Sequence, residues 1–186
     1  MINYKKITNY RRKPEELTEF LMWCTVTPGK RSDVITPKFN SMFVEQTPTK
    51  LLRSHKKNMQ ASLEKAGIGQ YDRITKCWNQ IKLLLKHQNL RDVKREELIN
   101  IEGIGPKTAS FFIAHSQAWS EVAVLDVHIL KYLQQQFPSY PVPEQTPQNL
   151  EEYQRLEWMF IGIAASKNMS SAELDNEIWQ SNALSQ

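Results

Sequence analysis

Residues 98–109 read Leu-Ile-Asn-Ile-Glu-Gly-Ile-Gly-Pro-Lys-Thr-Ala. Leu98 and Ile101 have the spacing of an apolar helix face, and the proline is suited to the first turn of a second helix. The Gly-Ile-Gly stretch between them can form a tight turn, because glycine tolerates positive φ angles. The stretch therefore predicts two helices joined by a hairpin. We expect Ile104 to be plugged between the helices and Ala109 to allow their close approach.

A hairpin of this kind is suited to binding a phosphate group. Its glycines leave main-chain N–H groups uncovered, and the amino-terminal end of the following helix carries partial positive charge. Such a corner can hold the DNA backbone without reading the base sequence. The sequence therefore predicts a DNA contact at Gly103, Ile104 and Gly105.

Elsewhere the chain has helical rather than strand periodicity. Apolar residues recur at intervals of three and four, and segments that alternate with a period of two are missing. Threonine–proline pairs at 36–37, 47–48 and 146–147 indicate helix starts. Residues 122–125, Val-Ala-Val-Leu, are expected to run extended through the core. We predict an all-α fold, with helices over 14–25, 49–65, 72–87, 93–100, 106–117, 127–136, 148–164 and 170–180.

Composition narrows the class of protein. Of the 186 residues, 40% are apolar and 10% aromatic, which is enough for a packed core and excludes a disordered tail. No apolar run approaches the roughly 18 residues of a membrane span, so we expect a cytoplasmic, nucleoid-associated protein. Cys24 and Cys77 are too few for a disulfide framework or a four-cysteine metal or iron–sulfur site.

The charge is unevenly distributed along the chain. Residues 1–60 contain 12 Lys and Arg against 5 Asp and Glu, residues 61–135 contain 10 against 8, and residues 136–186 contain 2 against 7. A basic amino-terminal half favours a polyanionic partner. Ordinary solvated helix faces would give the same balance, so charge alone does not identify the partner.

The hairpin and the residues after it resemble the helix-hairpin-helix DNA glycosylase superfamily, the HhH-GPD group. In that family an apolar run ends in a catalytic aspartate, and Val122-Ala-Val-Leu-Asp126-Val-His128 matches this pattern. Lys107 stands where the family's glycosylase/lyases have a catalytic lysine. The interval of 19 residues between Lys107 and Asp126 is similar to that of the 8-oxoguanine glycosylase/lyases. Residues 63–76, with their glycine turn, resemble the family as well.

Two further features of the sequence indicate which branch of the superfamily it resembles. The tail Glu173-Leu-Asp-Asn-Glu-Ile-Trp179 resembles the compact archaeal and bacterial 8-oxoguanine glycosylases, in which a tryptophan near the carboxyl end stacks on the flipped base. Lys107 argues against the adenine-mispair and alkylation branches, which lack it, and the missing cluster cysteines argue against the thymine-glycol branch. The similarity implies a two-lobed fold with the active cleft between the lobes, one formed by 1–29 and 136–186 and the other by 30–135.

The resemblance implies a bifunctional enzyme that excises a damaged base, 8-oxoguanine above all, from double-stranded DNA and then nicks the strand. Lys107 would attack the sugar C1′ and form a Schiff base, and we expect partial burial to favour its free amine. Asp126, the expected cap of the helix at Val127, would stabilise oxocarbenium character and help to move protons. His128 would contact a phosphate or orient Asp126, and Trp179 would stack on the base.

The remaining expectations concern cofactors and alternatives. We expect a monomer with no organic cofactor and no iron–sulfur cluster, and the resemblance implies a monovalent cation against the hairpin carbonyls. One alternative is a module that keeps the hairpin but binds DNA without chemistry. Another is an antiviral defence glycosylase that acts on a modified base in invading DNA. The other tryptophans are expected in the core: Trp23, Trp78, Trp119 and Trp158.

Overall fold

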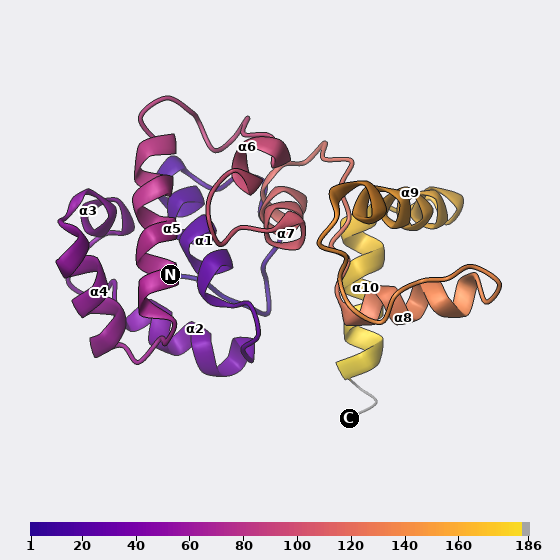
Figure 1. The fold of residues 1–186 in the computed structure, drawn as a ribbon, viewed down its shortest axis with the longest axis horizontal. Helices are drawn as coiled ribbons and strands as arrows, with labels where there is room; N and C mark the ends of the chain where they lie inside the picture. Colours follow the sequence, from indigo (N-terminus) through magenta and orange to yellow (C-terminus); the bar gives the residue numbers. More distant parts are fainter. Residues whose placement is uncertain (184–186) are drawn as a thin grey trace. The chain divides into compact units, whose positions relative to one another are not determined.

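The computed structural model describes residues 1–183, with side chains as far as residue 181. Within this range the chain forms ten α-helices and no β-strand, which confirms the all-α prediction (Figure 1). None of these helices is long and apolar enough to cross a membrane. In chain order they are α1 (Pro14–Val26), α2 (Ser32–Ser41), α3 (Pro48–Arg53), α4 (Lys56–Lys65), α5 (Tyr71–Leu84), α6 (Arg95–Ile99), α7 (Pro106–Ser116), α8 (Val127–Gln136), α9 (Leu150–Ser166) and α10 (Ser171–Ala183).

The chain divides into two compact units, and the boundary falls within the predicted hairpin. The first unit contains Met1–Ile104 and His115–Gln117, and the second contains Gly105–Ala114 and the residues from Ala118 onward. The lobes predicted from the sequence, 1–29 with 136–186 and 30–135, group the residues differently and stay a prediction.

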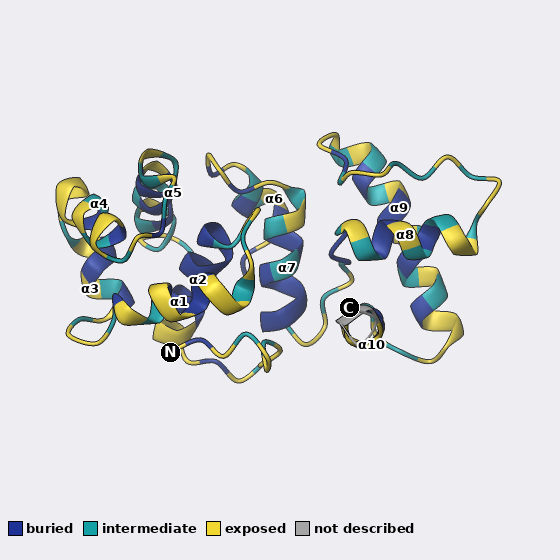
Figure 2. Ribbon diagram, turned by 90° about the horizontal axis from the view of Figure 1, so that it is seen from below, coloured by how far each residue is buried: buried dark blue, intermediate teal, exposed yellow. Residues whose placement is uncertain are grey.

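Helix α1 forms the centre of the first unit. Each of its residues from Leu17 to Val26 is buried, and it packs against α2, α3 and α5 (Figure 2). Two buried indole N–H groups in this core are bonded to threonine hydroxyls, as is usual for buried polar groups. The indole Nε1 of Trp78 donates to Thr25 Oγ1 at 2.9 Å, and that of Trp23 donates to Thr36 Oγ1 at 3.1 Å.

The segment before α1 is attached to the end of α7 by a buried arginine. The Arg12 guanidinium lies over the Phe20 ring, 3.8 Å from its centroid, and donates to the carbonyl oxygens of His115 at 2.7 Å and Asn9 at 3.1 Å. His115 Nδ1 lies 2.8 Å from the hydroxyl of Thr8. Burial lowers the pKa of His115 to about 4, so the ring is neutral at pH 7.

The helix predicted over 49–65 is in fact two helices, α3 and α4. Ser54 has extended backbone, with a ψ of 174°, and ends α3. His55 then begins α4 as its N-cap, because its Nδ1 accepts from the Lys57 N–H at 3.3 Å. The apolar periodicity continues through this break, which is why the sequence pattern alone suggested a single helix.

One of the three threonine–proline pairs caps a helix as predicted. The hydroxyl of Thr47 accepts from the Lys50 N–H at 3.2 Å, at the start of α3. The other two predictions are wrong: Pro37 lies inside α2, and α9 begins after Asn149, whose side chain is its cap. In both cases the threonine hydroxyl bonds elsewhere, and that of Thr146 donates to Leu125 O at 2.7 Å.

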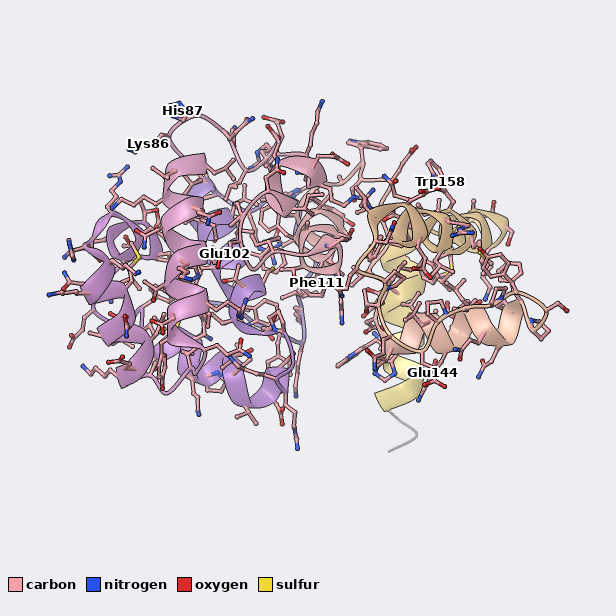
Figure 3. The ribbon with its side chains drawn as sticks, in the orientation of Figure 1. Lys86, His87, Glu102, Phe111, Glu144 and Trp158 are labelled. Carbon is pink, nitrogen blue, oxygen red and sulfur yellow. The ribbon has the colours of Figure 1, made fainter. Side chains whose placement is uncertain are left out.

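The tryptophan predictions are half right. Trp23 and Trp78 are buried, whereas Trp119 is 96% exposed and Trp158 is 63% exposed. Trp158 points away from α9 because the buried stripe of this helix, at 153, 156, 157, 160 and 164, leaves position 158 outside (Figure 3). Trp119 stands in the loop between α7 and α8.

Helices α8, α9 and α10 pack against one another in the second unit. Their shared core includes the fully buried side chains of Leu130, Leu133, Tyr153 and Phe160, with Leu174 from α10. This packing fixes the starts of α8 and α10, where the candidate site lies.

Candidate active site

The corner predicted from residues 98–109 is present, with α6 before the turn and α7 after it. Leu98 and Ile104 are buried in the first unit and Ala109 in the second, and the interlocking of the two helices stays a prediction.

The turn requires glycine at position 103, and at position 105 no atom lies where a side chain would stand. Gly103 has a φ of +90°, which other residues adopt only with strain. The N–H of Ile104 closes the turn by donating to Ile101 O at 3.0 Å. A Cβ added to Gly105 would meet no atom within 4 Å, so the main chain faces open space there. Space is therefore open on the side of Gly105 where a side chain would stand.

Lys107 is the second residue of α7, as predicted, and belongs to the second unit. Its side chain is exposed, so the expected partial burial is wrong. The physical reason is its place on the helix: the core face of α7 is taken by Ala109 and Phe112, which are fully buried.

The apolar run before Asp126 belongs to no helix and is buried at Ala123, Val124 and Leu125, which confirms the predicted passage through the core for these three residues, while Val122 is half-buried. Two residues of α9 hold it. The hydroxyl of Tyr153 donates to Ala123 O at 2.7 Å and accepts from the Leu125 N–H at 3.2 Å, while Glu157 Oε1 accepts from the Ala123 N–H at 2.8 Å. Because no neighbouring strand pairs with this segment, side chains supply the hydrogen bonds that its buried main-chain groups need.

Asp126 is the N-cap of α8, as expected. Its Oδ1 accepts from the N–H groups of His128 at 2.9 Å and Ile129 at 3.0 Å. One carboxylate oxygen is therefore fixed by the helix start, and the side chain is only partly buried. The cap orients the carboxylate, and a catalytic role is compatible with it.

Asp175 on α10 lies close enough to both predicted catalytic residues to feel their charges. The pKa of this carboxyl is raised to about 7, chiefly by burial and then by the negative charge of Asp126, while the ammonium of Lys107 acts in the opposite direction. Lys107 and Asp126 therefore both lie near Asp175 in the second unit. The start of α10 is attached to the same region, because Ser171 Oγ donates to Val122 O at 2.6 Å.

The two remaining predicted site residues flank this group. Trp179 follows Asp175 by one helical turn, so both project from the same face of α10, and its ring is 47% exposed. His128 lies in the first turn of α8, beside the Asp126 cap, and is partly buried. An aromatic face and an imidazole are thus placed within reach of the carboxylates.

Sequence reasoning missed Asp175, Tyr153 and Glu157. Asp175 stands four residues before Trp179 in the stretch that resembles the family's tail, so its helical spacing was a usable signal. Tyr153 and Glu157 are likewise four residues apart on one helix face, but nothing local reveals that their partner is main chain about 30 residues away.

The cysteines take no part in the site. Cys24 and Cys77 are both buried in helices of the first unit, and burial raises the pKa of the Cys77 thiol to about 12. Within residues 1–183, no group of three or more His, Cys, Asp and Glu side chains is arranged to hold a metal ion.

Comparison with known proteins places this geometry in a family. The family model described as 8-oxoguanine DNA glycosylase, of the helix-hairpin-helix type, matches residues 1–169. None of the curated proteins matches the chain.

Solved structures share the fold at low sequence identity. The 8-oxoguanine DNA glycosylase of Thermotoga maritima has a TM-score of 0.73 and 19% identity, over 94% of this chain and 83% of that one. The Methanocaldococcus jannaschii 8-oxoguanine glycosylase/lyase, in complex with 15mer DNA containing 8-oxoguanine, has a TM-score of 0.71 and 22% identity, over 94% and 84%. Since the matching family model spans nearly the whole chain, the protein belongs to the 8-oxoguanine DNA glycosylase family of helix-hairpin-helix proteins and is a DNA glycosylase.

Proposed function

We propose that the protein is a monomeric glycosylase/lyase that excises 8-oxoguanine from double-stranded DNA and then cleaves the strand at the resulting abasic site. The observation that carries this proposal is the shared electrostatic influence of Lys107 and Asp126 on Asp175. That a primary amine and a carboxylate both lie near Asp175 supports the proposal. This is the pair that a Schiff-base mechanism needs.

In this mechanism Lys107 Nζ attacks the sugar C1′. The glycosidic bond breaks, and the base leaves with its electron pair and takes up a proton. Asp126 stabilises the positive charge that develops on the sugar ring as the bond breaks. The attached nitrogen loses a proton and forms an iminium with C1′ as the C1′–O4′ bond breaks and O4′ takes up a proton, and the iminium acidifies the C2′ proton. Loss of that proton expels the 3′ phosphate and cleaves the strand.

The other predicted residues bind the DNA. The hairpin at Gly103–Gly105 holds a backbone phosphate through main-chain donors. His128 contacts a neighbouring phosphate or orients Asp126. The partly exposed ring of Trp179 stacks on the base once it has left the helix, since a flipped purine needs a flat apolar partner. The tail that contains Trp179 supports 8-oxoguanine as the base.

The resemblance also implies a monovalent cation against the hairpin carbonyls. Carbonyl oxygens are hard donors that suit such an ion. Gly103 O already accepts from the Arg73 guanidinium at 3.3 Å, so an ion would use the neighbouring carbonyls. Its contribution would be to hold the turn, and no step of the mechanism passes through it.

Borohydride trapping on a duplex with a single 8-oxoguanine tests the proposal. Reduction of the iminium leaves the protein covalently attached to DNA, which is seen as a shifted band. Lys107→Gln should abolish this band while binding to the duplex persists. Lys131→Gln, an exposed lysine of α8 in the same unit, should trap like the wild type.

The outcomes separate the alternatives. A band of undiminished strength in Lys107→Gln would show that another amine is the nucleophile. Trapping on abasic DNA but not on 8-oxoguanine duplex would support the lyase activity and show that the enzyme excises a base other than 8-oxoguanine. Salt-sensitive binding without trapping on any duplex would identify a binding module without chemistry.

A further inference from the structure

Three side chains on one face of α5 reach the first half of the hairpin. Arg73, Lys76 and Gln80 are spaced by three and four residues, so they project together. Gln80 Oε1 accepts from the Glu102 N–H at 2.9 Å, and Lys76 pairs with the Glu102 carboxylate at 3.7 Å. Glu102 accordingly lies beside α5 (Figure 3).

Arg73 makes the most extensive of these contacts. Its Nη1 donates to Gly103 O at 3.3 Å and its Nη2 to Thr25 O at 2.9 Å, at the end of α1. Gln70 Oε1 accepts from Nε at 3.0 Å and from Nη2 at 2.7 Å, which fixes the plane of the guanidinium. The side chain therefore connects the hairpin with two helices of the first unit.

Gly103 is required for this contact as well as for its φ angle. A Cβ at Gly103 would lie 3.2 Å from Arg73 Nη1, which is tighter than most Cβ contacts, so the guanidinium would have to shift by a few tenths of an ångström. The absence of a side chain thus lets the guanidinium lie against the turn. Together with Gln80, it bonds one group on each side of the Glu102–Gly103 link.

These hydrogen bonds limit the orientation of the peptide groups in the first half of the turn. The Glu102 N–H and the Gly103 carbonyl are bonded to α5, and the Ile104 N–H donates to Ile101 O. The next residue, Gly105, is the one that faces open space. The Gly103–Ile104 peptide plane is thus held both at its carbonyl oxygen and at its N–H, which leaves the two dihedral angles of Ile104 to set the direction of the next N–H.

We propose that Arg73 and Gln80 are positioning residues that hold the hairpin in its phosphate-binding conformation without touching the DNA themselves. This inference rests on the proposed binding of a phosphate at the hairpin. The Lys76–Glu102 pair contributes little, because both side chains are more than half exposed to solvent.

The test compares two variants with two controls. Arg73→Gln removes the guanidinium, and Gln80→Met removes the acceptor for the Glu102 N–H without changing the charge. Lys76→Gln removes one positive charge from the same face but releases no backbone group. Arg91→Gln removes a guanidinium that also bonds two backbone carbonyls, those of Tyr10 and Arg12, away from the hairpin.

The measurements are affinity for a duplex with a tetrahydrofuran abasic-site analogue at several salt concentrations, and the single-turnover excision rate at saturating enzyme. Arg73→Gln and Gln80→Met should each weaken binding about tenfold and reduce the salt slope by about one phosphate equivalent. The saturating rate should stay within about twofold of wild type, since the phosphate is held equally before and during the reaction. Arg73→Lys should recover part of the affinity.

The controls should change affinity by less than about threefold, a loss typical of one screened surface charge. A weaker affinity with an unchanged salt slope would overturn the proposal, because it would indicate general loosening of the fold. So would a loss confined to Arg73→Gln with wild-type binding by Gln80→Met, because Arg73 would then act through its own charge. Thermal unfolding, with Arg91→Gln as the reference, shows whether each variant is folded.

A separate pair of variants tests the hairpin site itself. Gly105→Asp should weaken binding more than Gly105→Asn, because only the carboxylate repels a phosphate. If the two bind equally, the phosphate site is refuted. If Gly105→Asp binds more weakly while the Arg73 and Gln80 variants bind like wild type, the phosphate site stands and the positioning role is refuted.

Discussion

Replacing Asp175 with asparagine should change how the stability of the protein depends on pH. In the folded protein the pKa of this carboxyl is raised to about 7 from an ordinary value of 3.8, mainly by burial and then by Asp126. Between these two values the folded state keeps the proton and the unfolded state has lost it. The free energy of unfolding therefore falls as pH rises through this window, and it levels off above pH 7.

The size of the effect follows from the two pKa values. A difference of about three pH units corresponds to at most about 4 kcal/mol. The side chain is only half-buried by its exposed area, so solvent reduces the penalty, and we expect about 1–2 kcal/mol. Asp175→Asn cannot ionise. It should match the wild type in stability near pH 4 and exceed it by about 1–2 kcal/mol at pH 8.

Urea unfolding at pH 4, 5, 6, 7 and 8 measures this difference directly. Glu177→Gln is a matched control, since it removes an exposed carboxylate from the same helix and should show no comparable trend. A constant difference between Asp175→Asn and wild type at every pH would refute the argument. A variant that becomes relatively less stable toward pH 8 would show that the ionised carboxylate stabilises the fold.

The other predictions concern the reaction and its DNA. Asp126→Asn should keep the α8 cap and near-normal stability but slow single-turnover excision by about 10²–10⁴-fold, so a near-normal rate would reduce Asp126 to a cap. Trp179→Ala should weaken the complex with 8-oxoguanine duplex roughly ten- to a hundredfold while cleavage at a pre-formed abasic site is spared, and an equal fall in both activities would make the ring structural. Duplex binding should weaken steeply with salt, and the Lys56→Glu, Lys57→Glu double variant should weaken binding to all duplexes equally, which a titration between low and physiological salt checks.

The sequence predicts a helix start correctly where the capping residues bond only to neighbours in the chain. Thr47 caps α3 and Pro14 opens α1 as predicted, since a cap depends only on neighbours in the chain. Thr36 and Thr146 carry the same local signal, but each hydroxyl bonds a distant group instead. A threonine–proline pair therefore predicts a helix start only where no tertiary partner competes for the hydroxyl.

The same distinction applies to the site. Lys107 and Asp126 could be identified because the hairpin and the apolar run before the aspartate are contiguous patterns. Asp175 carries only a partial local signal, its spacing of one helical turn from Trp179, because its closeness to Lys107 and Asp126 depends on the fold. Tyr153 and Glu157 look like ordinary members of an amphipathic helix, and only the fold shows that they bond the extended segment before Asp126.

The hairpin links the binding of DNA to the chemistry through its place in the chain. Gly105, which faces open space, is separated from Lys107 by a single residue, Pro106, at the start of a regular helix. A phosphate bound at Gly105 would therefore lie at a nearly constant distance from the Lys107 backbone, because a helix start has little freedom to deform. It follows that weakening the turn should lower affinity, whereas changing Lys107 or Asp126 should lower the rate. A hairpin variant that lowered the saturating rate as strongly as the affinity would mean that the turn also aligns the amine with C1′.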